Sequence, residues 1–256
     1  MLLLKRFHFP FPYLTPGYNS SEKEAQEVAA QINKETICGK AIVIQCDVSK
    51  EDEVQAMFKQ TIEKFGTVDI LVANSGLQKD APLHEMKLKD WQLVIDVNLT
   101  GQFLCAREAL REFMRRGIRE GVSKSLGKII HMSSVHQIIP WAGHTNYAAS
   151  KGALVMLMES ICQEYAPLKV RCNSIAPGAI KTDINRDAWE TQEALNKLNE
   201  LIKLSMKNYM LMPLMIYDVI MDLLEKDYYD IYDRNIIKAR LMELKPYINH
   251  VPQLEI

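Results

Sequence analysis

Glycine is scarce at both ends of this 256-residue chain. Gly17 is the only glycine before Gly39, and none occurs between residues 203 and 256. Glycine supplies the backbone freedom that tight turns and close approaches to phosphate groups need. The N-terminal region therefore carries no glycine-rich phosphate-binding loop, and a strand-turn-strand ending is not expected after residue 203.

An excess of one charge and long apolar runs are also missing. The formal net charge is -1 and charged residues make up 25% of the chain, so there is no basic stripe of the kind that binds nucleic acid. The apolar start at residues 1–4 is too short for a membrane span or a signal peptide. We therefore expect no nucleic-acid partner, no membrane partner and a cytoplasmic location.

Cysteine is present but without paired spacing, and three of the six histidines lie along a single strand and loop. Scattered cysteines in odd number are typical of reduced thiols and not of a disulfide frame or zinc site. One strand and one loop do not supply the converging ligands that a metal needs, so we expect no metal. The residues concerned are Cys38, Cys46, Cys105, Cys162, Cys172, His131, His136 and His144.

The richest stretch of the sequence predicts a buried strand, a loop and a helix. Residues 128–132 form a short apolar run that is entered by a glycine and ends in two serines, 133 and 134. A helix is expected from about residue 146, because a run of good helix formers follows there without proline. That helix places Tyr147 and Lys151 four residues apart on one face.

This pairing has a chemical use. An ammonium group beside a phenol favours the phenolate, so Lys151 is expected to lower the pKa of Tyr147 from its usual value of about 10. Such a phenol can exchange a proton with an alcohol, while a serine hydroxyl bonds the same oxygen. Tyr165 and Lys169 have the same spacing, but Pro167 between them indicates a helix end.

The rest of the pattern alternates between helices and strands, as in one α/β domain. Ser21 and Ser49 are the expected caps of the first two helices. Three prolines between positions 10 and 16 disfavour a buried strand there. Asn98 is unfavourable in mid-helix and marks either a functional site or a buried amide that satisfies backbone groups. The expected strands span 41–46, 68–72 and 170–175, and the expected helices span 21–32, 49–62, 91–110 and 146–166.

A basic cluster lies after the third of these helices. Arg115, Arg116, Arg119 and Lys124 have acidic neighbours in the sequence. That mixture predicts a solvated surface and not a phosphate site.

Together these residues resemble a known family. Ser134, Tyr147 and Lys151, with Asn98 before them and Pro177-Gly178 after them, are similar to the short-chain dehydrogenase/reductase family. Segments 132–136, 139–141 and 147–152 resemble its bacterial glucose 1-dehydrogenase group. The resemblance covers about residues 18–202, which leaves an atypical segment at 1–17 and a divergent, helical tail at 203–256.

The resemblance implies a Rossmann-like, doubly wound parallel sheet that is altered in its first strand-helix unit and at its C-terminal end. It implies an NAD(P)-dependent oxidoreductase acting on an alcohol or carbonyl substrate, with a sugar such as glucose to be tried first. Tyr147 would be the general acid/base, Lys151 its tuning cation, Ser134 the donor to the substrate oxygen and Asn98 the support of a proton relay. It also implies a homodimer or homotetramer built on the helices at 91–113 and 146–166.

The resemblance further implies which residues border the cofactor, NAD or NADP. Residues 18–20 hold neither an acidic side chain nor an arginine to select between the two. Read without the family, Asp47 is a turn or capping residue and the segment 74–76 is a turn. The implied set is Asp47, Val48, Asn74, Gly76, Tyr147, Lys151, Pro177, Gly178, Ile180 and Thr182.

One alternative follows from the missing glycine loop. Without that loop the pyrophosphate loses backbone donors and a helix N-terminus together. The chain would then be a catalytically impaired relative that acts as a non-enzymatic binding protein.

Overall fold

The computed structural model describes residues 13–15, 17–19, 21–35, 40–120, 123–178, 190–194 and 196. The chain divides into two compact units, residues 1–216 and 217–256, and every described residue lies in the first. None of the helices in the described ranges is long and apolar enough to cross a membrane. The expected tail at 203–256 lies outside the described residues.

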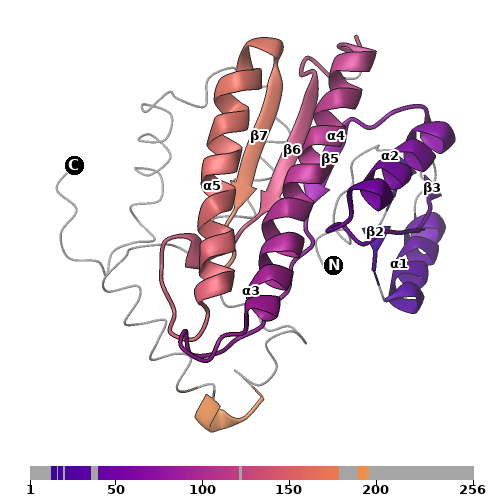
Figure 1. Cartoon of the computed structure of the whole chain (residues 1–256). Helices are drawn as coiled ribbons and strands as arrows, with labels where there is room; N and C mark the ends of the chain where they lie inside the picture. The colour runs from indigo at the N-terminus through magenta and orange to yellow at the C-terminus, as the bar shows by residue number, and fades with distance from the viewer. Residues whose placement is uncertain are drawn as a thin grey trace, which may run out of the picture. The chain divides into compact units, whose positions relative to one another are not determined.

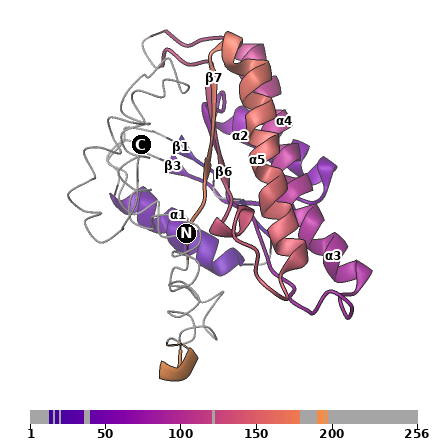
Figure 2. The ribbon, with the colours of Figure 1, turned by 90° about the vertical axis from the view of Figure 1, so that its left-hand side faces the viewer.

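The central sheet has three parallel strands in the order β5-β6-β7, namely Ile70–Ala73, Gly127–Met132 and Val170–Ile175. Residues 70–73 pair with 128–131, and residues 127–132 pair with 170–175. The three strands predicted at these places are confirmed: β7 has the predicted bounds, and the ends of β5 and β6 differ by at most two residues. Helices α4 (Gly101–Arg116) and α5 (Thr145–Tyr165) lie on one face of this sheet, α4 against β5 and β6 and α5 against β7, as Figures 1 and 2 show.

Helix α5 ends where the sequence predicts. Residues 166–168, which include Pro167, form a short 3-10 turn, and Lys169 takes a left-handed conformation with φ of 63°. Lys169 therefore does not continue the helix of Tyr165. The second tyrosine-lysine pair is a helix end, as predicted.

The N-terminal strands are shorter than the sequence suggests. β1 (Tyr13–Leu14) pairs with β3 (Lys40–Ala41), and β2 (Gly17–Tyr18) pairs with β4 (Ile44–Gln45), all in parallel. The continuous strand predicted at 41–46 is therefore wrong, since it is two separate ladders. Pro16 lies in the sequence between β1 and β2, and proline has no N–H to donate to a ladder. The prolines between positions 10 and 16 do not prevent short strands, but Pro16 coincides with the break between β1 and β2.

The two following helices match the prediction in place. α1 spans Glu22–Glu35, directly after Ser21, and α2 spans Glu51–Phe65. The cap predicted at Ser49 is wrong, because the N-cap residue of α2 is Lys50 and has no side-chain cap. The hydroxyl of Ser49 instead donates to Asp47 Oδ1 at 2.7 Å.

The long helix predicted at 91–110 exists and contains a bend. It consists of α3 (Leu88–Ile95), a π-helical turn over Asp96–Thr100, and α4. π turns insert one extra residue into a helix and are frequent at functional sites. Gly101 follows the turn, and a Cβ on Gly101 would lie 2.7 Å from Val48 Cγ2, so only glycine allows this close approach.

The core is closed by aromatic and aliphatic side chains between the helices and the sheet. Val54 and Phe58 of α2, Phe113 of α4 and Ile129 of β6 belong to one buried cluster. Gly127 makes room for Phe113, because a Cβ on Gly127 would overlap its ring. Burying a phenylalanine side chain stabilises a fold by about 1.5–3 kcal/mol.

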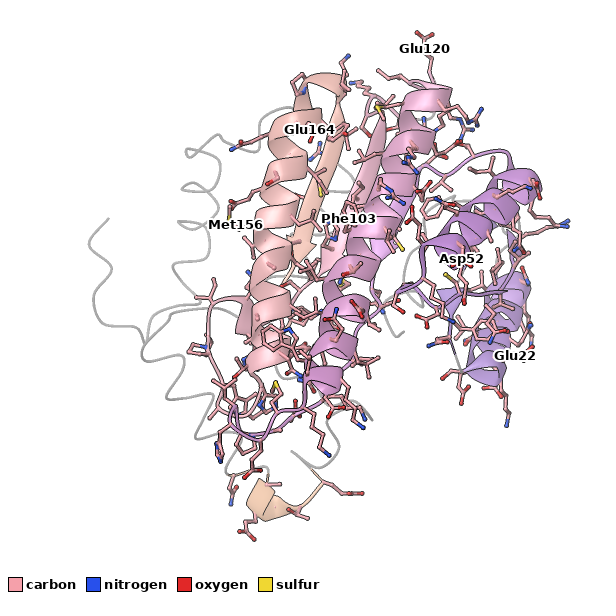
Figure 3. The ribbon with its side chains drawn as sticks, viewed as in Figure 1. Glu22, Asp52, Phe103, Glu120, Met156 and Glu164 are labelled. Atoms are coloured by element: carbon pink, nitrogen blue, oxygen red, sulfur yellow. The ribbon has the colours of Figure 1, made fainter. Side chains whose placement is uncertain are left out.

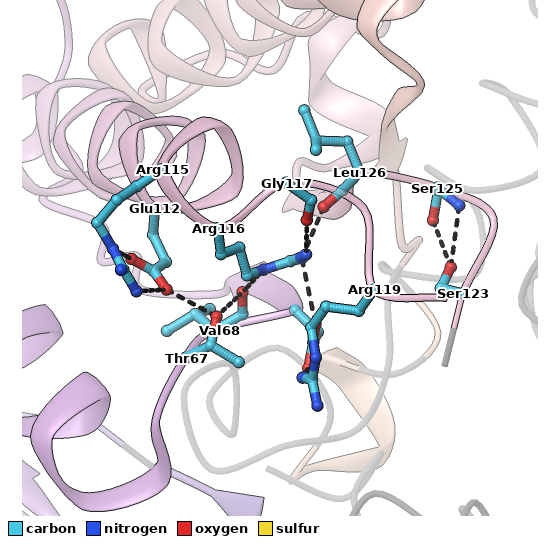
Figure 4. Close-up of polar contacts among 11 residues, drawn as sticks. Thr67, Val68, Glu112, Arg115, Arg116, Gly117, Arg119, Ser123, Ser125 and Leu126 are labelled. Carbon is cyan, nitrogen blue, oxygen red and sulfur yellow. Dashed lines mark hydrogen bonds and ion pairs between the residues drawn. The ribbon is translucent and has the colours of Figure 1, made fainter. Parts of the chain in front are cut away.

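Arg115 and Arg119 of the basic cluster have exposed side chains, at 61% and 41%, as predicted. Arg116 is buried instead, which corrects the prediction of a solvated surface at this residue. Figure 4 shows its guanidinium among backbone carbonyls: it donates to Val68 O at 3.1 Å and to Leu126 O at 2.6 Å. Its side chain is 7% exposed and also meets Asp69 at 3.1 Å. Arg116 thus joins the end of α4 to the starts of β5 and β6.

Candidate active site

The predicted catalytic side chains come together where β5 and β6 end. Ser134 follows β6, Tyr147 and Lys151 occupy successive turns of α5, and Asn98 projects from the π turn between α3 and α4. Parallel strands direct their carboxyl ends to one edge, which is where doubly wound sheets place their sites. Four residues from three segments of the chain are therefore assembled as the sequence predicts.

The two adjacent serines have different partners. Ser133 Oγ donates to the backbone oxygen of Lys151 at 3.1 Å, so this hydroxyl ties the strand to α5. Ser134 Oγ accepts from His136 N at 3.2 Å, and the Ser134 hydroxyl acts to lower the pKa of the Tyr147 phenol. The hydroxyl that meets the phenol is that of Ser134, the one selected from the sequence.

Lys151 lies beside Tyr147 but is held by the backbone. Its Nζ atom is 5.5 Å from the centre of the Tyr147 ring and donates to the carbonyl of Met132 at 2.7 Å. The residue is 4% exposed, and burial lowers the pKa of its amine to about 8. At neutral pH the amine is therefore largely protonated, and it becomes a neutral amine within the mildly alkaline range.

The predicted lowering of the Tyr147 pKa is wrong in this structure. Burial raises the pKa of the phenol above its usual value, the hydrogen bond with Ser134 lowers it in part, and the Asp80 carboxylate raises it further. Desolvation disfavours the charged phenolate, and this effect depends on tertiary packing that no spacing rule contains. Tyr147 is thus a protonated phenol at neutral pH, ready to donate.

Asn98 joins the site to a neighbouring loop. Its Oδ1 atom accepts from Leu77 N at 2.8 Å, and its Nδ2 atom donates to Leu77 O at 3.0 Å and to Ser150 Oγ at 3.1 Å. The Ser150 hydroxyl donates in turn to the backbone oxygen of Tyr147 at 2.7 Å. The completely buried amide therefore satisfies backbone groups, and its relay role stays a prediction.

Asn146 is a site residue that sequence reasoning missed. Its Oδ1 accepts from Tyr147 N at 2.8 Å, and its Nδ2 donates to Lys79 O at 2.8 Å. It is fully buried and fixes the first turn of α5 against the loop after β5. An asparagine at a helix start was the available signal, but its partner lies 67 residues away in the sequence.

A cluster of imidazole and indole rings reaches Tyr147 through His136, whose ring centre lies 5.0 Å from that of Trp141. Trp141 stacks on His144 with ring centres 4.2 Å apart, and His136 meets the Tyr147 ring edge at 6.1 Å. His144 Nε2 lies 3.3 Å from Asp80 Oδ2. The described part of the chain holds no group of three or more histidine, cysteine or acidic side chains placed to bind a metal.

Of the residues implied for the adenine side, Asp47 makes local contacts. Its carboxylate accepts from Ser49 N at 3.0 Å as well as from the Ser49 hydroxyl, and these bonds, led by that of the hydroxyl, lower its pKa. Its own N–H donates to Glu53 at 2.7 Å. The contacts of Asp47 are therefore those of a turn residue, which is how the sequence alone is interpreted at this position. Val48 packs against Gly101.

The other implied cofactor residues lie at the strand ends. Asn74 is exposed after β5, and Pro177 O accepts from Val135 N at 3.0 Å, with Gly178 next to it. Gly76 faces the catalytic group, since a Cβ there would lie 3.5 Å from both Asn98 Oδ1 and Lys151 Nζ. Ile180 and Thr182 lie outside the described residues.

Comparison with known proteins agrees with this geometry. The family model for short chain dehydrogenase matches residues 15–193. This chain belongs to the short-chain dehydrogenase family. Its Rossmann-like α/β fold is the one expected from the sequence, and its relatives are dehydrogenases.

Two curated relatives show the range of substrates in the family. Glucose 1-dehydrogenase 2 of Bacillus subtilis (strain 168) is 40% identical over 194 residues, which are 75% of this chain and 70% of that protein. 3beta-hydroxysteroid dehydrogenase 1 of Eggerthella lenta is 40% identical over 200 residues, 78% of this chain and 73% of that protein. Similarity alone therefore does not choose between a sugar and a steroid.

A solved structure supports the fold of this short-chain dehydrogenase. The gluconate 5-dehydrogenase from Burkholderia cenocepacia J2315, crystallised with NADP and tartrate, matches with a TM-score of 0.64 and 30% identity. The match covers 73% of this chain and 69% of that chain.

The residues present fit one half of a nicotinamide dinucleotide. Gly76 leaves space in front of Lys151 and Asn98, and the Lys151 amine is a donor suited to hydroxyl groups. The phosphate half lacks the glycine-rich loop of dinucleotide sites, because Gly17 is the only glycine before Gly39. The described residues thus bring the candidate catalytic side chains together beside Gly76, and no phosphate-binding loop is identified among them.

Proposed function

We propose that this short-chain dehydrogenase moves a hydride between a nicotinamide cofactor, NAD or NADP, and the carbon of an alcohol or carbonyl substrate. The observation that supports this most is the assembly of Ser134 at the end of β6 with Tyr147 and Lys151 of α5, where the Lys151 amine lies 5.5 Å from the centre of the phenol ring. A hydroxyl pair of this kind can bind one substrate oxygen from two sides. Bound nicotinamide supplies the hydride acceptor or donor.

The protein's own groups handle the proton. Tyr147 is protonated at neutral pH because burial raises its pKa, so it donates its phenolic proton to the oxygen of a carbonyl substrate during reduction. In the reverse direction the phenolate takes the proton from the alcohol. Ser134 donates to the same oxygen and orients it toward Tyr147.

Lys151 has two functions in this proposal. Its ammonium stabilises the negative charge on the Tyr147 oxygen whenever the proton has left. Its remaining N–H groups would hold hydroxyls of the cofactor ribose, next to the gap left by Gly76. Asn98 donates to Ser150, and Ser150 donates to the backbone oxygen of Tyr147, which holds the Tyr147 backbone in place.

A sugar is the substrate class we propose, with glucose first. His136 lies beside the Tyr147 ring and packs against Trp141, which stacks on His144, and a cluster of imidazole and indole rings suits a ligand with both hydroxyls and C–H faces. The similarity to a glucose 1-dehydrogenase supports this choice. The similarity to a hydroxysteroid dehydrogenase makes a 3β-hydroxysteroid the comparison substrate.

We also propose that the subunits associate through α4 and α5. Figure 3 marks Phe103 on α4 and Met156 on α5, and these apolar side chains are 42% and 62% exposed. Exposed large apolar side chains on adjacent helices favour association with another copy. A homodimer or homotetramer is the expected state.

Cofactor binding tests the proposal directly. NADH and NADPH are titrated into the purified chain while nicotinamide fluorescence is followed, and Tyr147→Phe serves as the variant that lacks the acid/base. Binding at tens of micromolar or better is the expected result. In a separate assay with NAD⁺ or NADP⁺ as the hydride acceptor, we expect glucose-dependent formation of NADH or NADPH at a rate that Tyr147→Phe lowers by about 10²–10⁴.

Two other outcomes of the cofactor titration would change the proposed function. A folded chain that binds neither cofactor at millimolar concentration would reject the enzyme and support the non-enzymatic relative. The missing phosphate loop provides the physical reason, since several charge-assisted hydrogen bonds worth about 1.5–3 kcal/mol each would be absent. Binding without glucose turnover but with steroid turnover would retain the reaction and replace the substrate.

A further inference from the structure

A buried polar pair lies directly behind the candidate site. His131 of β6 is fully buried, and its Nδ1 atom is 2.8 Å from Oε1 of Gln102 on α4. Gln102 is only 1% exposed, and its Nε2 atom donates to the backbone oxygen of Met132 at 3.3 Å. Two large polar side chains in an apolar layer need such mutual bonds to offset their desolvation.

The carbonyl at the end of this pair is also the one that holds the catalytic lysine. Lys151 Nζ donates to Met132 O at 2.7 Å, so one oxygen accepts from an ammonium and from a neutral amide. His131, Gln102, the Met132 carbonyl and Lys151 thus form one continuous chain of hydrogen bonds from the core to the site.

This series of hydrogen bonds determines which ring nitrogen of His131 carries the hydrogen. Because the amide N–H of Gln102 faces the Met132 carbonyl, its Oε1 faces His131, and Nδ1 must carry the hydrogen. A reversed amide would bring two oxygens together at 3.3 Å. His131 Nε2 is then an acceptor, and it has no partner within the described ranges. Burial and the nearby Lys151 charge lower the pKa of His131 to about 4, so the ring is neutral.

We propose that His131 and Gln102 are positioning residues of the candidate site, which compete with Lys151 for the Met132 carbonyl and so determine how tightly that oxygen holds the ammonium. The catalytic meaning of this proposal rests on the proposed function, whereas the interaction itself does not. Two donors on one oxygen weaken each other, because each withdraws electron density that the other needs.

Removal of the Gln102 amide is expected to raise the pKa of Lys151. Without the Gln102 amide, the carbonyl is left to Lys151 alone, and the ammonium is stabilised relative to the neutral amine. Lys151 then releases its proton at higher pH. The titratable and charged groups around it are Tyr147 on the same helix and His131 on β6, with His136 and Asp80 on the far side of Tyr147.

NMR titration of the full-length chain tests this without needing cofactor or turnover. The protein is labelled with ¹³Cε-lysine, its lysine signals are followed against pH, and Lys151→Met identifies the signal of Lys151. Gln102→Leu is expected to raise the midpoint of Lys151 by about half a pH unit, the equivalent of one ordinary hydrogen bond. Gln102→Met, which is unbranched, should give the same shift and provides a second variant if the first folds poorly.

Variants of His131 separate positioning from packing. His131→Leu leaves Gln102 free to turn and should raise the midpoint as Gln102→Leu does. His131→Asn places an amide donor near the position of Nδ1 and should restore the wild-type midpoint. Ile129→Val is the matched control, since Ile129 is also fully buried and lies two residues earlier on the same strand, hence on the same face.

An unchanged or lowered midpoint in a folded Gln102→Leu or Gln102→Met chain would overturn the proposal. So would an equal shift in Ile129→Val, because packing alone would then explain it. Failure of the proposed function has a different signature, namely absence of cofactor binding in a chain whose Gln102 variants still raise the Lys151 midpoint.

Discussion

The side-chain amide of Asn98 donates to the hydroxyl of Ser150 across 3.1 Å, and the two residues lie 52 positions apart in the sequence. The bond joins the π turn before α4 to the second turn of α5. Since Ser150 also donates to the backbone oxygen of Tyr147, a change at Asn98 reaches the proposed acid/base through two hydrogen bonds. The same amide holds both backbone groups of Leu77.

Replacing Asn98 by alanine is expected to destabilise the fold by about 2–4 kcal/mol. The change leaves the N–H and the carbonyl of Leu77 without their buried partner, and each unsatisfied group costs about 1–3 kcal/mol. Urea unfolding followed by circular dichroism measures the loss. Asn74→Ala is the control, because Asn74 is exposed and should change stability by less than about 0.5 kcal/mol. Equal effects of the two changes would contradict the role of Asn98.

A second prediction concerns the close contact between Gly127 and Phe113. Gly127→Ala adds a methyl group where the Phe113 ring already lies, and the fully buried ring has little room to move. We expect a loss of about 1–3 kcal/mol in the free energy of unfolding, the usual cost of overpacking a core.

Gly152→Ala is the matched control for this change. Gly152 lies within α5, and the nearest atom to a Cβ there, Gln137 O, is 3.7 Å away. Alanine in a helix is favoured over glycine by about 0.5–1 kcal/mol, so this variant should be as stable as the wild type or more so. A stable Gly127→Ala chain would show that the sheet and α4 are packed less closely than described.

Local patterns in the sequence were sufficient to predict the catalytic segment. The strand ending at Met132, the loop with Ser134 and the helix carrying Tyr147 and Lys151 follow from adjacent residues, and the structure places them as predicted. Long regular segments with clear periodicity and distinct end signals are the ones that sequence reasoning reads best.

The errors arise where the decisive contact is distant or competes with a local rule. The capping rule failed at Ser49 because Asp47 takes its hydroxyl. The predicted pKa of Tyr147 had the wrong direction because burial, a property of the assembled fold, raises it by more than the Ser134 hydroxyl lowers it. Gln102 and His131 were missed as a pair because 29 residues separate them.

Subunit association provides a third prediction. Met156→Glu puts a charge on the exposed apolar face of α5 and is expected to convert a dimer or tetramer into a monomer, because a buried unpaired charge is costly. Analytical ultracentrifugation of the full chain measures the change. Leu83→Glu is the control, since Leu83 is similarly exposed but lies before α3, away from the proposed interface. A wild-type chain that is monomeric at all concentrations would reject the assembly.

The buried histidine predicts how stability depends on pH. The pKa of His131 falls from 6.5 in the unfolded chain to about 4 in the folded one, so between these values the unfolded chain binds more protons. Its contribution to stability is therefore complete above pH 6.5 and is lost as the pH falls to 4, by at most about 3 kcal/mol. His131→Asn cannot titrate, and its urea midpoint should fall less steeply than that of the wild type over this range. His84→Asn removes a histidine whose side chain is 80% exposed, and it should follow the wild-type curve. Parallel curves for the wild type and His131→Asn would mean that the imidazole is accessible to protons in the folded state.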